Sequence, residues 1–264
     1  MIDSSKDHFH LAPRFQPLAR RAGLDAHAIF EHPSIRIWRK LPDRENGYID
    51  LDDDDGTVSR WHIKRFPARQ LRPLPAHDQV KSHHLAVAEQ IPTADLVGWG
   101  SLADSRSFII FENLPDFAPA DKLLETGFSF DRLLAPTAKL AALLHTRGLH
   151  HRDLYLCHFF VRAQADDDDL ELRLIDTARV RKLPVLFGRS RWIVKDLAQF
   201  LYSTSKLPVS ETQRQAWLDR YSRERGLASA AILRGPVRRK IKQIARHDAE
   251  LLRTRPQRNV SIPM

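Results

Sequence analysis

The side chains best suited to do chemistry lie together in residues 150–160, whose centre reads His-Arg-Asp-Leu. Asp153 is the carboxylate of this segment, and Arg152 stands directly before it. A carboxylate beside the point of attack can aim a hydroxyl group in line with a phosphoryl group and accept the hydroxyl proton. Arg152 is expected to pair with a neighbouring acid and hold the loop. The segment therefore predicts a catalytic loop for phosphoryl transfer, with Asp153 as its reactive group.

Two other segments supply charged side chains that suit the same reaction. Residues 172–175 form an alternating apolar run that ends at Asp176, where a carboxylate can hold a magnesium ion on the β- and γ-phosphates of a nucleotide. Lys64 lies within the strand-like residues 61–66, and a lysine on a rigid strand can contact the α- and β-phosphates. The order of lysine, His-Arg-Asp and strand-ending aspartate along one chain is the order found in kinases.

His158 follows Asp153 by five residues, at the position where protein kinases carry a metal-binding asparagine. Two interpretations of His158 stay open. Its imidazole can bind a divalent cation, although magnesium prefers oxygen, or it can hydrogen-bond the loop. Cys157 is flanked by apolar residues and is predicted to be a small buried hydrophobe.

These residues carry a resemblance to a known family. The string HRDLYLCHFFV, with residues 144–149 before it, resembles the lipopolysaccharide core kinases of Gram-negative bacteria, the Kdo kinase and heptose kinase group. Residues 108–115 are similar to the hinge strand of that family, and residues 191–198 are similar to a segment that follows its metal-binding aspartate. The resemblance covers about residues 30–225.

The resemblance implies a bilobal, protein-kinase-like α+β fold with a β-rich N-lobe and a helical C-lobe. It implies transfer of the γ-phosphate of ATP to a heptose or Kdo hydroxyl of the lipopolysaccharide core glycolipid. ATP and Mg²⁺ are the implied cofactors, with Asp176 and His158 at the metal and the backbone of Glu112 and Leu114 at the adenine. Asp196 is expected to brace the catalytic loop. The enzyme is expected in the cytoplasm, peripheral to the inner membrane.

The apolar pattern along the chain predicts the same two-part organisation. We expect an N-terminal extension of residues 1–30, an N-lobe of residues 31–115 and a C-lobe of residues 116–264. Predicted N-lobe elements are strands at 35–38, 48–51 and 61–66, near 97, and at 108–111, with a helix at 77–90. Predicted C-lobe helices lie at 121–125, 130–147, 195–205 and 211–225.

Three features of ordinary kinases are missing or displaced in this sequence. The helix acid that pairs with the strand lysine falls near Gln79, and Asp78 is the nearest acid, so either Asp78 substitutes or the pair with Lys64 is absent. No glycine-rich loop separates the first two predicted strands, and Asp176 is followed by Thr-Ala-Arg rather than Phe-Gly.

Composition describes a soluble globular chain with a basic surface. Of the 264 residues 42% are hydrophobic and 28% charged, and the formal net charge is +9. A basic balance indicates an anionic partner, and residues 234–258 predict a basic amphipathic helix. That helix is interpreted as a packing helix with a solvated face, with contact to an anionic membrane as the alternative. Nucleic acid is not expected, because charge alone supports it, and the oligomeric state stays open.

Two alternative functions stay open beside the resemblance. The chain could phosphorylate another hydroxyl, on a small molecule such as an aminoglycoside or on a protein, although the missing glycine-rich loop argues against an ordinary protein kinase. It could also be a pseudokinase that binds nucleotide or a partner without turnover, which the displaced helix acid and the missing glycine-rich loop favour. Intact Lys64, Asp153 and Asp176 oppose that interpretation.

Overall fold

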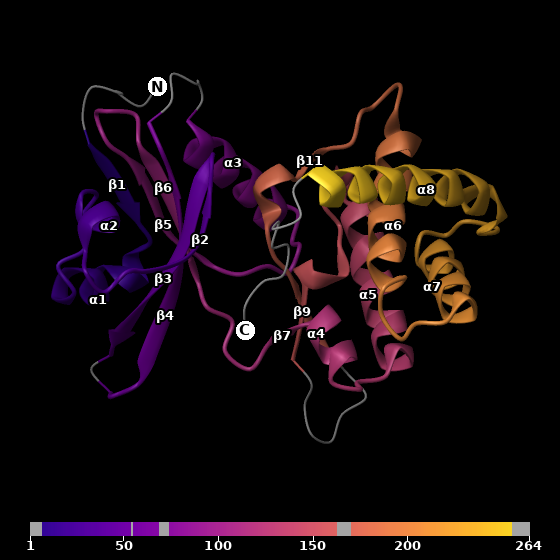
Figure 1. The fold of residues 1–264 in the computed structure, drawn as a ribbon, viewed down its shortest axis with the longest axis horizontal. Helices are drawn as coiled ribbons and strands as arrows, with labels where there is room; N and C mark the ends of the chain where they lie inside the picture. The colour runs from indigo at the N-terminus through magenta and orange to yellow at the C-terminus, as the bar shows by residue number, and fades with distance from the viewer. Residues whose placement is uncertain (1–6, 54, 69–73, 163–169, 255–264) are drawn as a thin grey trace. The chain divides into compact units, whose positions relative to one another are not determined.

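The computed structural model describes residues 7–53, 55–68, 74–162 and 170–254, which form two compact units (Figure 1). The first unit contains the chain up to His84 together with Ala94–Pro115. The second unit contains Leu85–Thr93 and the chain from Asp116 onward.

The first unit is built on one antiparallel sheet of six strands, with the helix α3 (Pro75–Ala88) up to His84. In sheet order the strands are β1 (His8–Leu11), β5 (Leu96–Ser101), β6 (Ser107–Glu112), β4 (Val58–Phe66), β3 (Arg44–Asp52) and β2 (Arg36–Leu41). On β4 the alternation of the sequence places Trp61 and Ile63 in the core while His62 faces solvent. The five predicted strands and the predicted helix of this region are all present.

The N-terminal segment, expected as an extension, supplies the sixth strand and part of the core. Strand β1 pairs with β5, and it is followed by η1 (Pro13–Phe15), α1 (Gln16–Arg21) and α2 (Ala28–Glu31). Leu18 and Ile29 from these helices are buried in the same cluster as Trp61. The pairing depends on Gly100, because a Cβ there would lie 2.2 Å from the carbonyl oxygen of His8.

The second unit is mainly helical, with two small sheets. Its helices are α4 (Ala120–Glu125), α5 (Phe130–Thr146), α6 (Arg189–Thr204), α7 (Glu211–Glu224) and α8 (Ala231–Thr254), with the 3-10 helices η2 (Leu156–His158) and η3 (Thr177–Arg179). Strands β7 (Ala118–Pro119), β9 (Phe159–Arg162) and β10 (Glu171–Leu174) form one sheet, and β8 (Leu149–His150) pairs with β11 (Arg181–Lys182). The predicted α+β class, with strands first and helices second, is confirmed.

Helix α8 packs along one face only. Leu233, Val237, Ile241 and Ile244 contact the core of the second unit, whereas basic residues on its other faces are exposed. The interpretation as a packing helix with a solvated basic face is confirmed, and residues 255–258 of the predicted helix lie outside the described residues. Across the described residues, no helix combines the length and the apolar character needed to cross a bilayer.

An aromatic stack joins α5, α6 and α7. The rings of Phe200 and Trp217 are stacked with centroids 4.0 Å apart. Trp217 donates its indole N–H to Thr137 Oγ1 at 2.9 Å, and Thr137 in turn donates to the Leu133 carbonyl at 2.6 Å. Both side chains of this hydrogen bond are fully buried, so the polar atoms depend on each other for partners.

Asp196 on α6 holds the loop that follows β8. Its buried carboxylate accepts the backbone N–H of His151 at 2.6 Å and of Arg152 at 2.8 Å, and His145 Nε2 lies 3.3 Å away. Burial raises the pKa of Asp196, but the interactions with His145 and His151 outweigh it, so this pKa lies below its usual range. Arg152 is held at φ 72°, a left-handed conformation that is costly for a residue with a side chain. The expected bracing role of Asp196 is confirmed.

Replacing Thr137 with valine keeps the side-chain shape but removes the acceptor of the Trp217 indole. We expect the free energy of unfolding to fall by about 1–3 kcal/mol, the cost of an unsatisfied buried donor, measured by urea denaturation. Thr126, which is exposed at the end of α4, provides the matched Thr126→Val control, expected to change by less than about 0.5 kcal/mol. Equal losses in the two variants would contradict this role of Thr137.

Replacing Asp196 with asparagine puts an N–H₂ group where a backbone N–H needs an acceptor. We expect a loss of about 2–4 kcal/mol of unfolding free energy, together with faster hydrogen exchange at the amides of His151 and Arg152. Asp219→Asn breaks an exposed ion pair with Arg234 and serves as control, with a loss below about 1 kcal/mol. Unchanged amide exchange in Asp196→Asn would show that the loop holds its shape without this carboxylate.

Candidate functional site

Asp153 lies in the second unit, on the loop held by Asp196. Its side chain is 24% exposed, and Arg179 Nη1 contacts both carboxylate oxygens, at 2.8 and 3.2 Å. Gln199 Nε2 lies 3.4 Å from Oδ1. The carboxylate is therefore oriented from two sides and still open to solvent, as a base that receives an incoming hydroxyl must be.

His158 and Asp176 lie beside this loop. His158 Nδ1 is 2.7 Å from the Asp153 carbonyl oxygen, to which it can only donate, and Nε2 is 3.9 Å from Asp176 Oδ2. Asp176 adopts a left-handed conformation, with φ 57° and ψ 47°. His151 Nε2 lies 3.1 Å from the Ile175 carbonyl oxygen, so the Asp153 loop contacts the strand end before Asp176. His158 thus hydrogen-bonds the loop, and its binding of a cation stays a prediction.

The pair of His158 and Asp176 also suits a divalent cation. One carboxylate oxygen and one imidazole nitrogen face each other, and Mg²⁺ commonly takes one or two protein ligands and completes its shell with water and phosphate oxygens. The described residues contain no group of three or more His, Cys, Asp or Glu side chains placed to hold a metal. Burial lowers the pKa of His158, but Cys157, the Asp176 carboxylate and the Asp153 carbonyl outweigh it and raise the pKa to about 9. A bound cation would have to replace that proton.

Basic side chains surround the Asp153 loop. Lys195 Nζ donates to the Arg152 carbonyl, and burial lowers the pKa of Lys195, with the Arg179 cation acting in the same direction. The Arg152 guanidinium lies 5.1 Å from the ring centroid of Trp192. Burial also lowers the Arg152 pKa. Arg152 contacts an acid, Asp196, through its backbone N–H; the expected pairing of its guanidinium with an acid stays a prediction.

Sequence reasoning did not place three of these side chains. Arg179, Gln199 and Lys195 surround Asp153 from residues 26 to 46 positions further along the chain. Arg179 carried a weak signal, because it follows Asp176 by three residues, and Lys195 stands next to the recognised Asp196. Cys157 is half-buried rather than buried.

The predicted nucleotide-binding lysine lies in the first unit. Lys64 is half-buried on β4, opposite Asn46 on β3 and Ile109 on β6. Asp78 and Gln79 are neighbours on α3. The amide oxygen of Gln79 is buried without a hydrogen-bond partner, so it accepts nothing from Lys64.

The predicted hinge residues follow β6. The Glu112 carboxylate is 2.7 Å from Arg14 Nη2, and its backbone N–H donates to the Asp95 carbonyl at 2.9 Å. Burial raises the pKa of Glu112, and Arg14 opposes the shift. Because the N–H of Glu112 is engaged, a backbone donor to an adenine ring nitrogen would have to come from Leu114. The Glu112 carbonyl could accept from the adenine amino group.

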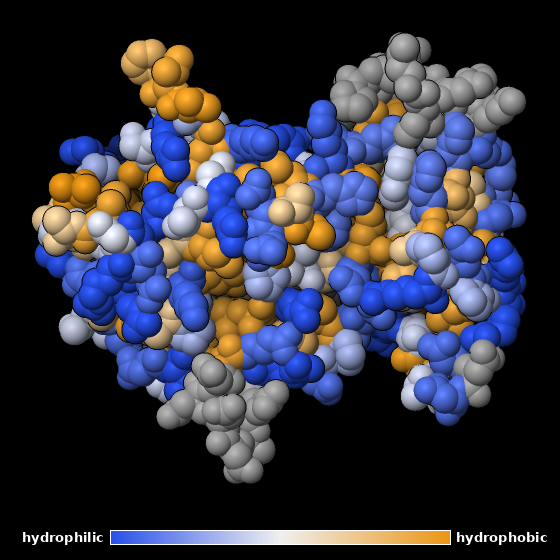
Figure 2. Space-filling view, turned by 180° about the vertical axis from the view of Figure 1, so that it is seen from behind, coloured by the Kyte–Doolittle hydropathy of each residue, from blue (hydrophilic) through white to orange (hydrophobic). Residues whose placement is uncertain are grey.

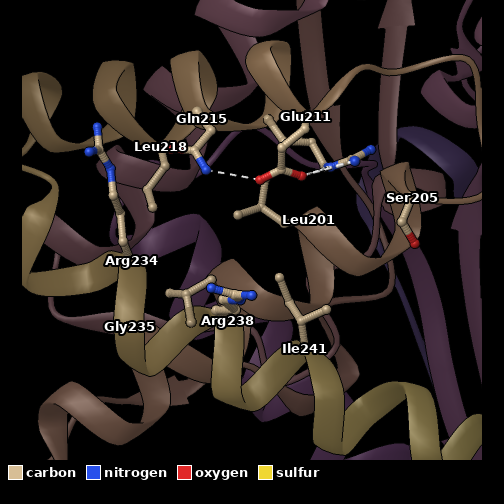
Figure 3. A pocket seen from close by; sticks show the side chains of 11 residues that line it. Leu201, Ser205, Glu211, Gln215, Leu218, Arg234, Gly235, Arg238 and Ile241 are labelled. Atoms are coloured by element: carbon tan, nitrogen blue, oxygen red, sulfur yellow. Dashed lines mark hydrogen bonds and ion pairs between the residues drawn. The ribbon is translucent and has the colours of Figure 1, made fainter.

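A cavity of about 750 Å³ lies among α6, α7 and α8 (Figure 3). Leu201, Leu218, Val237 and Ile241 form its apolar lining, and arginines from α7 and α8 border it. Its lining does not include Asp153, His158 or Asp176. It is thus separate from the Asp153 loop.

Comparisons with known proteins agree on one family. Residues 78–221 match the model of the lipopolysaccharide kinase (Kdo/WaaP) family. The chain is 26% identical over 226 residues to the lipopolysaccharide core heptose(I) kinase WaaP of Escherichia coli (strain K12), covering 76% of this chain and 83% of the relative. It is 24% identical over 178 residues to the heptose(I) kinase WaaP of Pseudomonas aeruginosa, covering 66% and 54% respectively.

The fold is also that of a solved relative. A structure described as WaaP in complex with acyl carrier protein superposes with a TM-score of 0.61 at 21% identity, over 93% of this chain and 95% of that one. The resemblance drawn from the sequence is therefore confirmed, as is the kinase-like fold. The family model spans more than half of the chain, and the chain belongs to the lipopolysaccharide kinase (Kdo/WaaP) family, whose members are kinases of lipopolysaccharide core sugars.

Proposed function

We propose that this protein transfers the γ-phosphate of ATP to a hydroxyl of an inner-core sugar of lipopolysaccharide, with Asp153 as the base. The observation that carries the proposal is a partly exposed Asp153 carboxylate on a loop whose Asp153 carbonyl contacts His158, which in turn faces Asp176. Two curated relatives are heptose(I) kinases, which favours heptose over Kdo as the acceptor. The reaction would take place in the cytoplasm, at the inner face of the inner membrane.

Asp153 has the geometry to receive the hydroxyl of the acceptor. Arg179 and Gln199 limit the rotation of its carboxylate, while its exposed edge leaves room for a hydroxyl to donate a hydrogen bond. Orientation and proton acceptance are most of what phosphoryl transfer asks of a protein carboxylate. A pseudokinase would not need an oriented, solvent-exposed carboxylate at this position.

The cations near Asp153 suit the charge that develops on the transferred group. Arg179 forms an ion pair with the Asp153 carboxylate, and Lys195 interacts electrostatically with the same carboxylate. Positive groups held in place before the reaction stabilise negative oxygens without reorganising when the charge appears. We assign Lys195 and Arg179 to the phosphoryl oxygens or to anionic groups of the acceptor.

Asp176 and His158 would hold Mg²⁺, which when bound neutralises charge on the β- and γ-phosphates. Both residues are kept in place by the protein: His158 by the Asp153 carbonyl and Asp176 by the strand end that His151 contacts. In the first unit, Lys64 would contact the α- and β-phosphates. The backbone of Glu112 and Leu114 would contact the adenine.

Asp153→Asn removes the proton acceptor but keeps the size of the side chain. We expect kcat for phosphate transfer to fall by about 10²–10⁴-fold with little change in nucleotide affinity. The measurement is transfer of labelled phosphate from ATP to core lipopolysaccharide extracted from a strain that lacks the gene, followed by mass spectrometry of the core oligosaccharide. Asp219→Asn is the matched control and keeps its activity; equal kcat values in both variants would remove Asp153 from the reaction.

Asp176→Asn and His158→Ala each remove one proposed cation ligand. We expect each to weaken the Mg²⁺-dependent part of nucleotide binding by about tenfold or more, measured with a fluorescent ATP analogue titrated with and without Mg²⁺. Binding without Mg²⁺ should change little. The exposed His247 on α8 provides the His247→Ala control. If His158→Ala binds Mg²⁺ and nucleotide normally while Asp176→Asn does not, His158 serves only as a hydrogen-bond donor to the loop.

A further inference from the structure

Three consecutive apolar side chains project into solvent between β11 and α6. Val185 is 90% exposed, Leu186 84% and Phe187 88%, the highest values among the large hydrophobic residues that are exposed in the described chain. We call residues 185–187 the apolar tip; Figure 2 shows the segment between β11 and α6 as a hydrophobic projection. Single exposed apolar residues are common on soluble proteins, but a contiguous group with this exposure marks an interaction surface.

The base of the tip is fixed. Leu183 is buried, and its N–H donates to the Gly148 carbonyl at 2.7 Å. On one side β11 pairs with β8, which leads into the Asp153 loop. On the other side α6 begins at Arg189 after Gly188 and carries Asp196, which braces the same loop. The tip is thus connected at both ends to elements that position Asp153.

The charge around the tip is of one sign. Residues 177–195 contain no Asp or Glu and six basic residues, namely Arg179, Arg181, Lys182, Arg189, Arg191 and Lys195. Lys182, Arg189 and Arg191 are exposed and flank the tip. An apolar tip between exposed cations complements a bilayer that has an acyl interior and anionic phosphates at its surface.

We propose that the apolar tip inserts into an anionic lipid bilayer while Lys182, Arg189 and Arg191 bind the lipid phosphates. The inference rests on the proposed function, because lipopolysaccharide carries its core sugars on a lipid anchor. Insertion holds the enzyme on the surface that carries its acceptor, and the fixed base of the tip keeps the Asp153 loop close to that surface. The basic face of α8 is not needed for this contact.

The first test is co-sedimentation of the full chain with vesicles. Wild type should bind vesicles of phosphatidylethanolamine and phosphatidylglycerol and bind phosphatidylcholine vesicles weakly. The triple variant V185S/L186S/F187S should partition about tenfold less onto the anionic vesicles, and K182Q/R189Q should lose the part of binding that salt weakens. Val58→Ser, which removes an exposed apolar side chain of the first unit, should bind like wild type. Leu186→Ser alone, with a smaller loss, serves if the triple variant does not fold.

Binding by the triple variant equal to wild type overturns the proposal. So does a triple variant that changes from dimer to monomer in sedimentation velocity while vesicle binding is unaltered, since the tip would then contact a second copy. A loss of binding to acyl carrier protein with unaltered vesicle binding has the same meaning, because the tip would then contact that protein.

A second measurement separates this inference from the proposed function. The triple variant should phosphorylate a delipidated core oligosaccharide at the wild-type rate and an acceptor embedded in vesicles about tenfold more slowly. If wild type phosphorylates neither acceptor but binds anionic vesicles through the tip, the proposed function fails and the membrane contact stands. If both acceptors are phosphorylated equally well by wild type and variant, the membrane contact is overturned and the kinase function stands.

Discussion

The structure of the site depends on one buried carboxylate. Asp196 is an anion in the interior of the second unit, and it is stable there because two backbone N–H groups and His145 satisfy its oxygens. Its hydrogen bond to the backbone of Arg152 stabilises a left-handed conformation there, which is energetically unfavourable for a residue other than glycine. The same helix, α6, supplies Lys195 and Gln199 to the surroundings of Asp153. One helix therefore sets both the shape and the electrostatics of the Asp153 loop.

Hydrogen bonds connect the loop that Asp196 holds to the neighbouring residues of the site. The Asp153 carbonyl fixes the ring of His158, and His151 links the loop to the strand end before Asp176. The proposed base and the proposed metal ligands are thus parts of one connected network within the second unit. The proposed membrane contact is connected to this network, because the apolar tip joins β11 to α6. A kinase for a lipid-anchored sugar has reason to couple its surface contact to its catalytic loop in this way.

The elements with clear apolar periodicity could be predicted from the sequence. The helix predicted at 130–147 is α5 (Phe130–Thr146), and the helix predicted at 211–225 is α7 (Glu211–Glu224). Strand β1 could not be predicted, because four residues reading His-Phe-His-Leu show no usable period. Its place in the sheet follows from the close approach that Gly100 on β5 allows. Arg14 of that N-terminal segment contacts Glu112 of the predicted hinge. This contact could not be predicted from the sequence either.

The sequence by itself determined the α+β class, the family and the order of Lys64, Asp153 and Asp176, because short motifs and periodic patterns are carried by residues adjacent in the chain. Only the tertiary structure decided that Arg179 contacts Asp153, that Asp196 is shared by two backbone amides, and that an apolar run at 185–187 is exposed. These outcomes depend on where chain segments 20 or more residues apart are packed. An apolar run reads the same in sequence whether the fold buries it or leaves it in solvent, so its exposure is a property of the packing alone.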